Sequence, residues 1–242
     1  MYMNINKQLL ILAGLGALAV GYFAGNASVL NLQHSPAHIE AIAVKDFQEG
    51  YDTQAFKLFT NLAGKGDKTA AFYLGQMYEF GDGVAVDRQK AVKWLSIAAN
   101  AGNSGAARQL GLLYLDGIAG VQDFAKARKW LLAAADNGDG TALRSLGDMN
   151  REGLGAPADP VTAYAYYSVA AIKGNGYGTT MRDKLASSLS ADQQRKGQDK
   201  ARSIQARIDA AQATAKPPAT TTPAIPTKDK TGAAAPSGKA GS

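Results

Sequence analysis

The stretch AVKWLSIAANAG, residues 91–102, is one of three related copies in the chain. ARKWLLAAADNG follows at 127–138 and AYAYYSVAAIKG at 163–174, so each copy begins 36 residues after the one before. The apolar residues of the first copy have the spacing of one helical face: Ala91, Trp94, Leu95, Ala98 and Ala99. A single helix cannot bury such a face alone, so the fixed period predicts identical units stacked on one another.

A second segment precedes each copy and repeats with the same period. These segments are AAFYLGQMYEFG at 70–81, AARQLGLLYLDG at 106–117 and ALRSLGDMNREG at 142–153. Each carries a glycine in the middle of an expected helix, where glycine costs about 1 kcal/mol relative to alanine. We therefore expect close helix crossings at these glycines, which are Gly75, Gly111 and Gly147.

The ends of the expected helices repeat as well. An aspartate stands four residues before each copy of the second helix, where its carboxylate can accept hydrogen bonds from free backbone N–H groups. These aspartates are Asp87, Asp123 and Asp159. Gly81 and its equivalents suit a left-handed helix stop. The aromatic residues in register on the alanine-rich face are expected to lie in the core: Trp94, Trp130 and Tyr166.

These signals predict an all-α protein, an α/α superhelical solenoid of helical pairs. The expected organisation, in chain order, is a signal peptide or transmembrane anchor at 1–27, a linker at 28–36, an N-terminal helical pair at 37–68, repeats at 69–104, 105–140 and 141–176, C-terminal capping helices at 177–209, and a disordered Pro/Ala/Thr/Lys-rich tail at 210–242.

The N-terminus contains an uncharged apolar run from Leu9 to about Gly25. The run is long for the core of a signal peptide and slightly short for a membrane span, so both interpretations stay open. Lys7 precedes it and no Lys or Arg follows until Lys45, which places the rest of the chain outside the cytoplasm by the positive-inside rule. The expected location is the bacterial cell envelope: single-pass in the inner membrane with periplasmic repeats, or periplasmic or secreted after cleavage.

The formal net charge is +6, and about half of it comes from the C-terminal tail. The charge on the rest of the chain is therefore too small to indicate a nucleic-acid-binding surface. The tail could add a weak attraction to anionic lipid or to a cell-wall polymer. The chain has no cysteine, so disulfides, thiolate metal sites and a cysteine nucleophile are excluded.

The repeated pattern A-x-x-x-L-G-x-x-Y-x-x-G, a short loop, then D-x-x-K-A-x-x-W and A-A-x-x-G, resembles the Sel-one-like repeat family, a relative of the tetratricopeptide repeats. The third copy departs from it, with Asn150 where the others have Tyr78 and Tyr114. The resemblance implies a solenoid with a concave groove and a non-catalytic role in assembling or regulating protein complexes, often in bacterial envelopes.

If the first helix of each pair lines the inner surface, as in tetratricopeptide relatives, the exposed residues include apolar and arginine side chains. Exposed Phe and Leu could anchor a protein or peptide partner, and Arg could pair with its carboxylates. The candidate groove residues are Phe72, Gln76, Phe80, Arg108, Leu112, Leu115, Arg144, Asp148 and Arg151.

Two other roles stay open, a cell-envelope hydrolase acting on cell-wall or β-lactam substrates and a structural spacer between membrane and wall. We expect no enzymatic activity, no cofactor and no metal site. His34 and His38 are interpreted as linker histidines because Pro36 lies between them. The acidic residues near the groove are interpreted as solvated helix ends: Glu79, Asp116 and Glu152.

Overall fold

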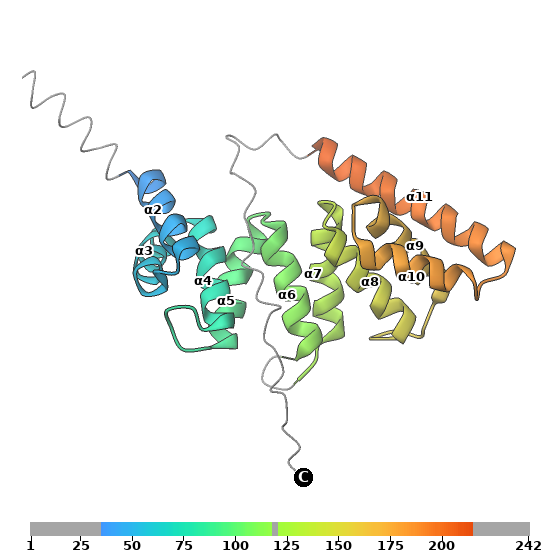
Figure 1. The fold of residues 1–242 in the computed structure, drawn as a ribbon, viewed down its shortest axis with the longest axis horizontal. Coiled ribbons are helices and arrows are strands. Elements are labelled where there is room, and N and C mark those ends of the chain that lie inside the picture. The colour runs from blue at the N-terminus through green and yellow to red at the C-terminus, as the bar shows by residue number, and fades with distance from the viewer. Residues whose placement is uncertain (1–34, 118–120, 215–242) are drawn as a thin grey trace, which may run out of the picture.

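The computed structural model describes residues 35–117 and 121–214, and these residues form helices and connecting turns without an extended sheet. Figure 1 shows the helices following one another along the molecule until the last helix, which runs back over those before it. Their bounds are α2 Pro36–Glu49, α3 Asp52–Gly64, α4 Lys68–Phe80, α5 Arg88–Asn100, α6 Ser104–Asp116, α7 Phe124–Asp136, α8 Gly140–Glu152, α9 Pro160–Ile172, α10 Gly176–Ala186 and α11 Ala191–Thr214. The prediction of an all-α solenoid is confirmed.

Both ends of the predicted organisation differ in detail. The expected linker includes Pro36, but α2 begins there, with Ser35 as its N-terminal cap. The expected tail begins at residue 210, but α11 continues to Thr214. The signal peptide or anchor at 1–27, and the tail from residue 215 onward, lie outside the described residues.

Within residues 35–117 and 121–214, we find no helix that is both long enough and apolar enough to span a membrane.

The repeated glycines lie where the two helices of each pair cross. A Cβ atom added to Gly111 on α6 would lie 2.6 Å from Cγ of Leu131 on α7. The equivalent distances are 2.5 Å from Gly75 to Leu95 Cγ and 2.7 Å from Gly147 to Tyr167 Cδ1. Normal van der Waals contact needs about 3.5–4.0 Å between carbons. The predicted close crossings are confirmed, and only glycine allows them.

The predicted caps are also present. Asp87, Asp123 and Asp159 accept hydrogen bonds from the backbone N–H of the third residue beyond each of them. Gly81 ends α4 and Gly153 ends α8 in the left-handed helical conformation, whereas the equivalent Gly117 has a positive φ of 89° with a ψ of 116° outside that region. These contacts satisfy free backbone groups at the helix ends and fix where each helix begins and stops.

The prediction that Trp94 and Trp130 lie in the core is wrong. Trp94 and Trp130 are half-buried at the edge of the helix interface, whereas Tyr166 is buried as expected. Lysine ammonium groups lie over both indoles, at 5.9 Å from the ring centroid for Lys93 and 5.2 Å for Lys129. The second helix of each pair packs against the first helix through the residue that follows Trp94, Trp130 or Tyr166. These fully buried residues are Leu95, Leu131 and Tyr167.

The last helix, α11, lies lengthwise on α9 and also reaches α7. Lys200 lies 3.4 Å from Asp159 at the start of α9. Near the other end of α11, Arg207 pairs with Asp136 at 2.7 Å, and Gln212 donates a hydrogen bond to the Asn137 carbonyl. Thr214 therefore lies beside the turn that joins α7 to α8.

Candidate functional site

The predicted groove residues line two adjoining hollows on the first helices of the pairs. The first hollow, of about 190 Å³, lies between α4 and α6 and is lined by Gln76, Glu79, Phe80, Arg108, Gln109 and Leu112. The second, of about 330 Å³, lies between α6, α8 and α10 and is lined by Leu112, Leu115, Asp116, Arg144, Ser145, Asp148, Met149, Arg151, Glu152, Leu154 and Tyr177. Leu112 belongs to both hollows. We call the two hollows together the groove.

Phe72 is the one predicted groove residue that does not line either hollow. Only 2% of its surface is exposed, and its ring packs beside Tyr73 with 5.6 Å between centroids. The ring also reaches the first turn of α6, because a Cβ added to Gly105 would lie 3.5 Å from its Cζ. The next repeat covers Phe72, so its predicted exposure is wrong.

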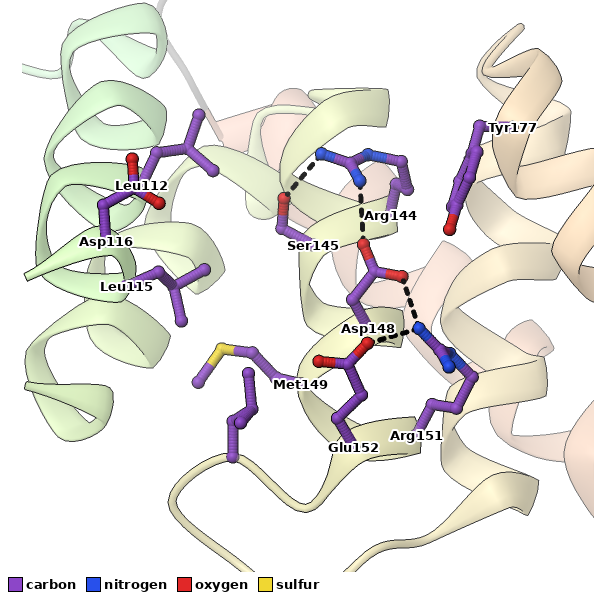
Figure 2. A pocket seen from close by; sticks show the side chains of 11 residues that line it. Leu112, Leu115, Asp116, Arg144, Ser145, Asp148, Met149, Arg151, Glu152 and Tyr177 are labelled. Carbon is purple, nitrogen blue, oxygen red and sulfur yellow. Dashed lines mark hydrogen bonds and ion pairs between the residues drawn. The ribbon is translucent and has the colours of Figure 1, made fainter. Parts of the chain in front are cut away.

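The second hollow has one mainly apolar wall and one charged wall, as Figure 2 shows. Leu112 and Leu115 project from α6 toward the charged side chains of α8. Tyr177 of α10 stands at the far side, with the Arg144 guanidinium 5.3 Å from its ring centroid. An apolar wall facing a charged wall can hold an amphipathic segment.

The charged wall is organised around Asp148. Its Oδ2 pairs with Nη1 of Arg144 at 2.8 Å, and its Oδ1 accepts a hydrogen bond from the Tyr167 hydroxyl at 2.6 Å. Arg151 donates from Nε to the same hydroxyl oxygen at 3.2 Å, and it pairs with Glu152. Burial and the neighbouring Asp148 raise the pKa of Tyr167. The network ties the groove surface to the core beneath it.

Each groove arginine is ion-paired within the chain. Arg144 and Arg151 belong to the Asp148 network. Arg108 Nε lies 3.3 Å from Oδ2 of Asp139 at the start of α8, without hydrogen-bond alignment. A partner carboxylate would have to compete with these ion pairs. The sequence alone could not show that the arginines are already paired.

Glu79 is not the solvated helix end that we expected. It is half-buried in the first hollow, and its Oε2 accepts a hydrogen bond from Gln109 Nε2 at 2.5 Å. The pKa of Glu79 is raised from 4.5 to about 7, mainly by burial and in smaller part by the nearby Asp116. The Gln109 hydrogen bond and the charges of Arg88 and Arg108 oppose this increase.

Asp116 and Glu152 are exposed, as expected for solvated helix ends. The Asp116 carboxylate forms no ion pair or hydrogen bond with any part of the chain that the structure describes, and its charge helps to raise the pKa of Glu79. Glu152 pairs with Arg151. Among the described carboxylates that line the groove, the two without an ion pair are therefore Glu79 in the first hollow and Asp116 in the second.

Several residues that line the groove were not predicted from the sequence. Gln109 and Ser145 are buried polar side chains, 8% and 2% exposed, and they occupy the same position in successive repeats. A polar residue at a repeated core position was the signal that could have revealed them. Tyr177 had no such signal, because it belongs to α10 beyond the last full repeat.

No group of three or more His, Asp or Glu side chains among residues 35–117 and 121–214 is placed to hold a metal ion.

Stacked helical pairs with a groove along their first helices define an α/α repeat protein. The family model of the Sel1 repeat matches residues 68–103, 104–139 and 141–175. The chain therefore contains three Sel1 repeats in succession. Repeats of this kind generally serve as scaffolds for protein–protein interaction.

Several solved structures are similar to this chain. A Sel1 repeat protein from Oxalobacter formigenes is 25% identical, with a TM-score of 0.61, over 79% of this chain and 81% of that one. The protective antigen c5321 of uropathogenic Escherichia coli, which displays an SLR fold, is 21% identical with a TM-score of 0.49, over 82% of this chain and 51% of that one. None of the curated proteins matches the chain.

Proposed function

We propose that this chain is a non-catalytic scaffold that binds a protein or peptide partner in the groove. The observation that carries the proposal is the convergence of residues from four helices, α4, α6, α8 and α10, on two adjoining hollows. Both hollows combine apolar surface with buried or half-buried polar groups, the combination found at the centres of protein interfaces.

Two exposed aromatic residues are the best candidates for anchors of the partner. Phe80 is 51% exposed at the first hollow, and Tyr177 is 47% exposed at the second. Aromatic side chains at the centre of an interface carry a large share of its binding free energy. Leu112 and Leu115 supply apolar surface between them.

The test is affinity purification from the native host with Phe80→Ala plus Tyr177→Ala. Each truncation of an anchor costs about 1–2 kcal/mol or more, so recovery of a specific partner should fall by roughly tenfold or more. Quantitative mass spectrometry of the captured proteins measures the change. The matched control is Ile172→Ala, since Ile172 is 68% exposed and lies on α9 outside both hollows. Equal recovery by the double variant and the control would assign partner binding to another surface.

We also propose that the chain works in the bacterial cell envelope, with its repeats on the periplasmic side. The support is the sequence pattern of residues 1–27, in which one lysine precedes an apolar run. The expected result is a chain that begins at Met1 in the membrane pellet, or one that begins near Ser28 in the soluble envelope fraction. Cell fractionation with N-terminal sequencing distinguishes these two forms. Recovery of the full chain in the cytoplasmic fraction would contradict the proposal.

A further inference from the structure

The lysine-rich segment 215–242 follows α11, whose end lies at the α7–α8 turn. Gln212, two residues before the end of α11, contacts the carbonyl of Asn137 in the α7–α8 turn. Two residues further along that turn, Asp139 pairs with the groove residue Arg108. Asp116 follows Arg108 by about two turns of α6, or roughly 12 Å at 1.5 Å per residue.

Two carboxylates that line the groove, Asp116 and Glu79, have no ion pair among the described residues. Arg108, Arg144 and Arg151 each pair with a carboxylate of the chain. Asp116 has no such partner among the described residues, and Glu79 has a hydrogen bond to Gln109 in place of an ion pair. Asp116 lines the larger hollow and Glu79 the smaller one. The pKa of Glu79, raised to about 7 mainly by burial, leaves it partly protonated at neutral pH, so Asp116 supplies most of the attraction for a cation bound there, and the charge of Arg88 opposes it.

Segment 215–242 has the complementary chemistry. Its side chains include four lysines and one aspartate, a net charge of +3, together with five prolines that suit an extended peptide. At about 3.1 Å per residue an extended segment of this length spans roughly 90 Å, far more than the distance to the groove. Lys228 and Lys230 flank Asp229 in the middle of the segment, next to Pro226 and Ile225.

We propose that residues 215–242 bind the groove of their own chain, with lysine side chains at Asp116 and Glu79 and with proline and alanine against Leu112 and Leu115. The segment is joined to the same chain as its site, so its effective concentration is in the millimolar range and weak intrinsic affinity is enough for occupancy. This inference rests on the proposed function, because the tail would compete with the partner for the same surface.

The test is zero-length carbodiimide crosslinking of the full chain, which joins a lysine to a carboxylate in contact with it. We expect amide bonds from Lys228 or Lys230 to Asp116 or Glu79, at least tenfold more abundant than tail crosslinks to exposed carboxylates elsewhere. Asp116→Asn should abolish its own crosslink and weaken that of Glu79. The matched control Asp183→Asn removes an exposed carboxylate on α10 that lines neither hollow. The pair of Lys200 and Asp159 serves as the positive control within the same sample.

An equal mixture of ¹⁴N- and ¹⁵N-labelled chains identifies the chain that supplies the tail. Crosslinks of a single isotope support binding within one chain, whereas mixed-isotope crosslinks would assign the groove to the tail of a second copy and overturn the proposal. Tail crosslinks spread evenly over exposed carboxylates, with Lys200–Asp159 present, would also overturn it. Removal of residues 215–242 should raise partner recovery severalfold. If the crosslinks fail while Phe80→Ala plus Tyr177→Ala still loses the partner, only this inference is wrong.

Discussion

Leu131→Ala is expected to lower the free energy of unfolding by about 2–5 kcal/mol, the range for leucine truncations in protein cores. Leu131 is fully buried and fills the crossing of α6 and α7 opposite Gly111. Neighbouring repeats share their interfaces, so the loss should extend beyond one repeat. Chemical denaturation measures the total change, and hydrogen exchange should report faster opening in α6, α7 and α8. Ile172→Ala, at a 68% exposed position, should change stability by less than about 0.5 kcal/mol.

The same crossing predicts a specific coupling between Gly111 and Leu131. Gly111→Ala alone should destabilise the protein by about 1–3 kcal/mol, because its Cβ would overlap Leu131. In the Leu131→Ala background the overlap is removed, and alanine should gain up to about 1 kcal/mol of helix propensity over glycine. A double-mutant cycle measures this difference. Simple additivity of the two changes would show that the helices separate at this point in solution.

Glu79→Gln is expected to remove a pH-dependent loss of stability. The folded protein holds the Glu79 proton more tightly than the unfolded chain, because burial raises its pKa from 4.5 to about 7. The stabilisation associated with that proton is complete below about pH 4.5 and is lost as the pH rises to about 7. At about 1.36 kcal/mol per pKa unit, the loss is about 3 kcal/mol.

Glutamine keeps a hydrogen-bonding group beside Gln109 but does not ionise. The variant should therefore gain up to about 3 kcal/mol over wild type at pH 8 and little at pH 4. Urea denaturation at a series of pH values measures the difference. The matched control is Glu152→Gln, which alters an exposed carboxylate of the same groove. Parallel pH profiles for wild type and Glu79→Gln would show that Glu79 ionises normally in the folded protein.

The repeats could be predicted from the sequence because they follow from local physics. The 36-residue period, the central glycines and the capping aspartates each constrain the backbone independently, and all three agree. The groove face was predicted for the same reason, since residues at equivalent positions of successive first helices must share one surface.

The electrostatics of the groove could not be predicted, because they depend on contacts between repeats. Arg108 of α6 forms an ion pair with Asp139 at the start of α8, and Glu79 of α4 accepts a hydrogen bond from Gln109 of α6. Periodicity shows which face a residue occupies but not which side chain of the next repeat approaches it. Phe72 was misplaced for this reason, because the first turn of α6 covers it.

The position of α11 also affects the elasticity of the solenoid. A stack of helical pairs can bend along its length, because each pair contacts only its neighbours. α11 lies across α9 and α7 and forms polar contacts at both, through Lys200 and Arg207. It therefore holds the second and third repeats in a fixed relative position. No described helix packs across α4 and α5 and a neighbouring repeat in the same way. The chain should accordingly have a stiff half around the larger hollow and a compliant half around the smaller one, which can open or close to fit the segment bound there.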